Sequence, residues 1–160
     1  MSEPDVTLTD YGLFVECAAF AWLIARRPAT LEALRRWIIA FFAFTALAAL
    51  SGGTVHGFFN AEDDGMGRVL WKLSMLAIGA TALAGWAIAA RLLFARDGAD
   101  RALSIAGGLT GVYAVTILFV SDAFWVAAVG YLPAAALLFV AFLTAAVRDR
   151  ASWARLGGWR

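Results

Sequence analysis

The chain contains one histidine and one cysteine, so few of its residues could bind a metal or act as nucleophiles. The histidine, His56, lies in the run SGGTVHG at residues 51–57. Ser51 and His56 are about 140° apart around a helix, so they form no ready nucleophile–base pair. A catalytic zinc usually takes three protein ligands, so a zinc site at His56 would need two carboxylates, for example from Asp63, Asp64 or Asp122. The same acidic residues would equally suit a cation that prefers oxygen ligands.

Other polar side chains fall within or beside long apolar stretches. Ionisable groups in such stretches cost about 2.5–3.5 kcal/mol each on insertion scales and are functional candidates by default. We expect them to line one polar cavity. The candidates for catalysis are Glu16, Ser51, His56, Asp63 and Asp64, and those for substrate binding are Lys72, Asp122 and Tyr131. Alternatively, Lys72 could pair with Glu16 or reach lipid head groups, and the aspartates could be solvated loop residues.

The composition indicates an integral membrane protein. Of the 160 residues, 62% are hydrophobic and 16% are charged, and the net charge is +1. A soluble domain is nearer half apolar and a quarter charged, so a soluble enzyme is excluded. Without a basic excess, the composition also predicts no nucleic-acid partner. With a single cysteine, Cys17, an intrachain disulfide is excluded.

Five apolar stretches are long enough to cross the hydrocarbon layer, which takes about 20 residues of helix. The sequence therefore predicts an all-α bundle of five transmembrane helices forming one domain over residues 1–160. The expected spans are Leu8–Ala25, Trp37–Phe59, Val69–Phe94, Ala102–Val120 and Phe124–Val147. The acidic N-terminus does not resemble a signal peptide, so we expect the first span to be retained.

Local signals predict how two of these spans begin and bend. Thr7 and Asp10 have the capping-box spacing, which predicts that the first helix begins there. Pro133 lies inside the last span and predicts a kink.

Two pairs of glycines have the small-xxx-small spacing of close helix contacts. Gly53 and Gly57 form one pair, and Gly107 and Gly111 form the other. We expect close packing against a neighbouring helix at both.

The distribution of charge predicts the orientation. One side of the expected bundle carries 11 of the 13 Lys and Arg residues and a net charge of +7, while the other side carries −6. Because cytoplasmic loops are enriched in Lys and Arg, we expect the N-terminus outside and the C-terminus in the cytoplasm. The expected cavity then opens to the outer face, and the composition fits a bacterial inner membrane.

Ser51-x4-His56 near the end of an outward-running helix, followed by Asp63 and Asp64, resembles part of the CREST superfamily of membrane hydrolases. This superfamily includes alkaline ceramidases and adiponectin-receptor-like proteins. The resemblance covers about residues 5–75 and includes an acidic residue in the first span, Glu16. It implies a zinc amidase site to which Ser51, His56 and one of the two aspartates would belong. This sequence departs from the family pattern: the family has Ser-x3-His, seven spans and two further histidines on the last span.

Three functions remain open from the sequence. The first is a small metal-dependent hydrolase acting on a lipid or amphiphile, with His56 as metal ligand or general base and Ser51 as a hydrogen-bond donor. The second is a non-enzymatic subunit of a larger membrane complex, or a module that binds a lipid, quinone or pigment. The third is a transporter or channel built as a homo-oligomer. The expected partners are accordingly membrane lipids, and another membrane protein or a second copy of the chain.

Overall fold

The computed structural model describes residues 4–28, 31–59 and 65–155, with side chains described as far as Arg148. The described residues form five helices and no strand: α1 (Pro4–Ala25), α2 (Glu32–Phe58), α3 (Gly65–Leu93), α4 (Arg96–Phe119) and α5 (Phe124–Arg155). All five contain a stretch long and apolar enough to cross a membrane. The predicted all-α class and the five apolar helices are confirmed.

The helices extend beyond the apolar stretches that predicted them. α2 begins at Glu32 rather than Trp37, and α4 begins at Arg96 rather than Ala102. Hydropathy detects only the part of a helix suited to hydrocarbon, whereas backbone hydrogen bonding continues through polar turns at its ends. The capping-box prediction is also wrong. α1 begins at Pro4, so Thr7 already lies inside the helix and does not cap it.

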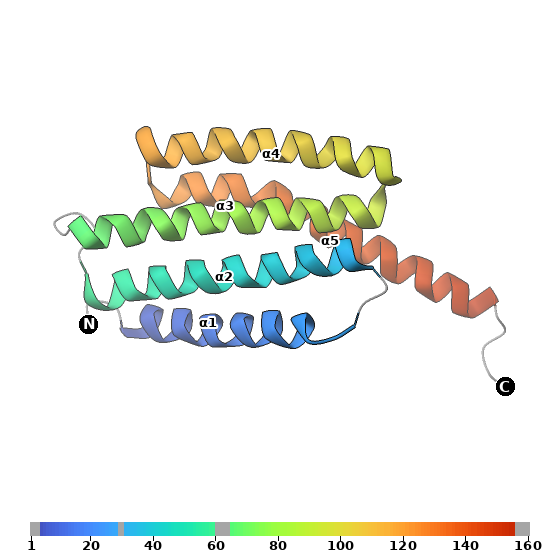
Figure 1. The fold of residues 1–160 in the computed structure, drawn as a ribbon, viewed down its shortest axis with the longest axis horizontal. Coiled ribbons are helices and arrows are strands. Elements are labelled where there is room, and N and C mark those ends of the chain that lie inside the picture. The colour runs from blue at the N-terminus through green and yellow to red at the C-terminus, as the bar shows by residue number, and fades with distance from the viewer. Residues whose placement is uncertain (1–3, 29–30, 60–64, 156–160) are drawn as a thin grey trace.

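Successive helices run in opposite directions (Figure 1). α1 packs on α2, α2 packs on α3, and α3 packs on both α4 and α5. In the described helices, neither α1 nor α2 packs against α5. Pro133 lies inside α5, and the C-terminal part of this helix changes direction and projects past the other helices (Figure 1).

α3 is the central helix of the bundle. In its most apolar stretch 67% of the residues are buried, against 6% in α1. Small side chains let several helices approach its axis closely. Its buried alanines are Ala77, Ala82, Ala84, Ala87, Ala89 and Ala90.

Side chains from α3 and α4 fix the position of α4. The indole Nε1 of Trp71 donates a hydrogen bond to the backbone oxygen of Asp122 at 2.9 Å, just beyond α4. The ammonium of Lys72 donates to the backbone oxygen of Leu118 at 3.1 Å, in the last turn of α4. The hydroxyl of Tyr113 donates to the backbone oxygen of Met75 at 2.7 Å. The connection from α4 to α5 is thus attached to the N-terminal turns of α3.

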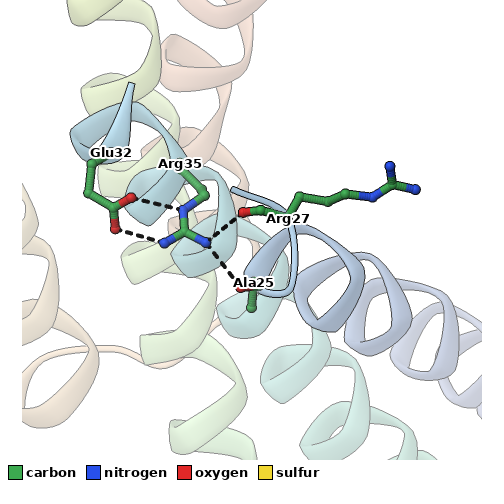
Figure 2. A network of polar contacts seen from close by, with 4 residues as sticks. All are labelled: Ala25, Arg27, Glu32 and Arg35. Carbon is green, nitrogen blue, oxygen red and sulfur yellow. Dashed lines mark hydrogen bonds and ion pairs between the residues drawn. The ribbon is translucent and has the colours of Figure 1, made fainter. Parts of the chain in front are cut away.

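One arginine holds together the connection between α1 and α2 (Figure 2). The Arg35 guanidinium donates two hydrogen bonds to the Glu32 carboxylate, at 3.1 and 2.9 Å. Its Nη1 donates to the backbone oxygens of Ala25 and Arg27, each at 3.0 Å. The last carbonyls of a helix have no partner within it, and Arg35 supplies one at the end of α1.

Candidate functional site

A cavity of about 790 Å3 lies between α1, α2, α3 and α5. We call it the groove. In the described helices α1 packs on α2, and α5 packs on α3 but not on α1 or α2, so the groove lies along α3 between α5 and the pair α1 and α2. Its volume falls within the usual 300–1,000 Å3 of small-molecule sites. Most of the lining is aliphatic or phenylalanine, and the polar lining residues are Asp10, Thr45, His56, Trp71, Ser74, Thr81 and Tyr131.

The charged and imidazole groups of the groove lie on α1 and α2. Asp10 lies near the start of α1 and His56 near the end of α2, and both side chains line the groove. The imidazole ring meets the Trp71 ring edge-on, with the centroids 5.8 Å apart. Trp71 is in turn held by its hydrogen bond to Asp122. The position of His56 in the groove is therefore supported from α3.

Ser74 brings a hydroxyl to the same part of the groove. This hydroxyl donates to the backbone oxygen of Ala48 at 2.9 Å, which joins α3 to α2. A methyl group added at Gly52 would lie 3.1 Å from Ser74 Oγ and 3.6 Å from Asp10 Oδ2. Both oxygens therefore border one small area of α2 that carries no side chain.

The glycines of α2 let α1 approach closely, which confirms the predicted packing at Gly53 and Gly57. A methyl at Gly53 would lie 2.8 Å from Asp10 Cβ, and one at Gly57 would lie 2.9 Å from Thr7 Cγ2. Real side chains do not tolerate such distances, so only glycine allows this contact. The contact fixes where the Asp10 carboxylate enters the groove.

The other predicted glycine contact is not made within the described chain. Methyl groups added at Gly107 and Gly111 would meet no atom within 4 Å. Both glycines lie on the exposed side of α4.

The structure brings together only some of the predicted site residues. His56 and Tyr131 line the groove. Ser51 does not: its hydroxyl is buried and donates to the backbone oxygens of Leu47 and Ala48 in its own helix. Lys72 binds the end of α4 instead of a substrate position.

The predicted acidic residues also separate. Glu16 is exposed and is not part of the groove lining. It follows Thr7 by nine residues, roughly 180° around the helix, so it lies opposite the face that packs on α2. Asp122 contacts Trp71 through its backbone oxygen. Asp63 and Asp64 lie outside the described residues.

The sequence analysis missed Asp10 and Ser74. Asp10 was interpreted as a capping residue, because it precedes most of the apolar run. The sequence did place Asp10 on the same helix face as Thr7, because residues three apart share a face. In the structure Thr7 is fully buried against α2, and Asp10 lies on that face. Ser74 offered no comparable signal, since a serine in an apolar helix usually bonds its own backbone.

The described residues include only part of the zinc site that the resemblance implies, because Asp63 and Asp64 lie outside them. In the ranges that the structure describes, no group of three or more His, Cys, Asp or Glu side chains is close enough to hold a metal ion. Beside His56 the groove presents one carboxylate, that of Asp10. A catalytic zinc usually takes three protein ligands.

The described residues thus define a bundle of five helices of membrane-spanning length with a largely apolar groove that carries a carboxylate and an imidazole. The chain belongs to a family of unknown function, DUF6962, whose model matches residues 6–158. No curated protein and no solved structure matches the chain.

Proposed function

We propose that this chain is an integral membrane protein that binds one small amphiphile in the groove. The observation that carries the proposal is the groove itself, with its volume of about 790 Å3 and a mostly apolar lining. Asp10 and Ser74 both lie beside Gly52, and His56 lies one helical turn further along α2. Sites for small molecules combine this kind of apolar wall with a few placed polar groups. The head of the amphiphile would lie at Asp10 and His56, and its tail along α3 and α5.

Binding agrees with the geometry better than hydrolysis does. Ser51, the predicted hydrogen-bond donor of the hydrolase, donates its hydroxyl to the backbone oxygens of Leu47 and Ala48 in its own helix. The retained prediction is the alternative one, a module that holds a lipid-like molecule.

The proposal includes an orientation. The start of α1, the end of α2, the start of α3 and the α4–α5 connection share one end of the bundle, and by sequence this side carries the net charge of −6. By the positive-inside rule this end faces outward and the C-terminus is cytoplasmic, in a bacterial plasma membrane. Asp5→Cys, in a Cys17→Ser background, should then react with an impermeant maleimide in intact cells, whereas Asp97→Cys should react only after permeabilisation. The opposite pattern would reverse the orientation.

Filling the groove tests the proposed function. Ala128 lines the groove on α5, and Ala128→Phe would occupy the space intended for the amphiphile. Ala19→Phe makes the same change at an exposed position of α1, away from the groove, and is the matched control. Each protein is purified in a mild detergent, and its bound small molecules are extracted, identified and quantified by mass spectrometry.

We expect the original chain and Ala19→Phe to retain about one molecule of a particular amphiphile per chain, and Ala128→Phe to lose most of it. Equal retention by both variants would show that the molecule binds elsewhere. Recovery of bulk lipids alone, in equal proportions from all three proteins, would refute the function.

A further inference from the structure

We propose that the amphiphile held in the groove carries a protonated amine and that Asp10 recognises it. This inference rests on the proposed binding function and names the chemical class of the ligand.

The Asp10 carboxylate is positioned but has hydrogen-bonding capacity to spare. Its Cβ and Oδ2 lie against Gly53, and Oδ2 also lies near Gly52, so the close contact of α1 with α2 fixes the group at the groove wall. No hydrogen-bond donor among the described residues reaches it. A carboxylate has about four acceptor sites, and a partly buried charge is costly unless it is paired. A ligand with N–H donors and a positive charge would satisfy both needs.

The charges around Asp10 favour a cation over an anion. Among the described residues, the groove lining contains no lysine or arginine, and its other titratable side chains are His56 and Tyr131. Lys72 follows Trp71 in sequence, but its ammonium binds the backbone oxygen of Leu118. An anionic head would have to lie beside the Asp10 carboxylate with no fixed cation from the described lining. An ammonium head meets the carboxylate directly.

Two further features agree with an amine. The rings of Trp71, Phe124 and Tyr131 line the groove, and aromatic faces attract cations. By sequence, the side of the bundle nearest Asp10 carries a net charge of −6 with Asp10 included, and this negative charge raises the local concentration of cations.

Three amphiphiles of equal chain length distinguish the contribution of head-group charge to binding from that of the apolar tail. They are dodecylammonium, dodecanol and dodecanoate. The full chain is placed in nanodiscs of zwitterionic lipid, and the affinity for each compound is measured from the rise of Tm with its concentration. The proteins compared are the original chain, Asp10→Asn and Ala128→Phe. Asp10→Asn keeps the shape of the side chain and the Cβ that packs on α2.

We expect dodecylammonium to bind the original chain at least about tenfold more tightly than dodecanol, because one charge-assisted hydrogen bond strengthens binding by about this factor. Dodecanoate should bind most weakly. Asp10→Asn should remove the advantage of the amine, and Ala128→Phe should weaken both the amine and the alcohol.

Equal binding of all three compounds by the original chain, with all three weakened by Ala128→Phe, would overturn the amine but leave the groove function. Tightest binding of dodecanoate would also overturn the amine, and this comparison needs no variant. Failure of every compound to bind, with no effect of Ala128→Phe, would overturn the groove function as well.

Discussion

Replacing Gly57 by alanine would change the contact between α1 and α2 at a single point. The added methyl would lie 2.9 Å from Thr7 Cγ2 and 3.1 Å from Thr7 Oγ1, whereas carbon atoms in contact are about 3.5–4.0 Å apart. Rotation of the Thr7 side chain does not relieve the overlap. Two of the three staggered positions on its Cβ face the methyl, and Cγ2 and Oγ1 together always fill at least one of them. Thr7 is fully buried, so α1 itself must move by several tenths of an ångström.

The cost follows from this overlap. Overpacking a close contact costs about 1–3 kcal/mol, and alanine recovers up to about 1 kcal/mol of helix propensity over glycine. With the full recovery, we therefore expect Gly57→Ala to lower the free energy of unfolding by up to about 2 kcal/mol. Thr7→Ala removes both clashing atoms and leaves Thr7 Cβ, at 3.6 Å, as the nearest atom, which is an ordinary contact. In the Thr7→Ala background, Gly57→Ala should be neutral or slightly stabilising.

A double-mutant cycle measures this coupling. The free energy of unfolding of the original chain, both single variants and the double variant is obtained by SDS titration in mixed micelles. We expect the double variant to be more stable than the sum of the single effects by about 1–3 kcal/mol. Gly12→Ala is the control, because a methyl at Gly12 meets nothing within 4 Å. Strict additivity, or equal effects of Gly57→Ala and Gly12→Ala, would refute the described contact between α1 and α2.

Three further predictions concern the hydrogen bonds and packing contacts that join the helices. Lys72→Met should lower the free energy of unfolding by about 0.3–1 kcal/mol, since it removes a cation from the C-terminus of α4; if Lys72 instead bound the ligand, stability would be unchanged and affinity would fall. Arg35→Lys keeps the charge but loses the planar fork that makes four hydrogen bonds; amide hydrogen exchange at the end of α1 should accelerate, and unaltered exchange would contradict the role of this residue. Gly79→Ala should destabilise by about 1–3 kcal/mol in the same SDS titration, because its methyl would lie 2.6 Å from Cδ1 of the Tyr113 ring; a neutral effect would show that this ring can move aside.

The number and approximate place of the helices could be predicted, because each depends on a local property, the length of an apolar run. Their exact bounds could not, as α2 and α4 show. Both begin with charged turns at Glu32 and Arg96 that hydropathy does not count but that form helix nonetheless. α5 likewise extends beyond the predicted Val147 to Arg155.

The candidate site was predicted in part. His56 was identified because a single histidine beside glycines is visible in sequence, and the structure places it in the groove. Glu16 was selected for its depth in the span, but depth does not say which way a side chain faces. The glycine face of α2 decides the direction, since it contacts the side of α1 that carries Thr7 and Asp10.

The sequence alone determined that the chain is mostly apolar, that it forms five helices, and that the two sides of the expected bundle differ in charge. Each of these properties follows from the composition of a local stretch of sequence and does not depend on how the helices pack. Tertiary structure alone decided that Asp10, His56 and Ser74 share a groove, that Ser51 faces its own backbone, and that Gly107 and Gly111 have no neighbour in the described chain. The physical reason is that every helix here is apolar on most of its circumference, so which face is buried depends on the helix that packs against it.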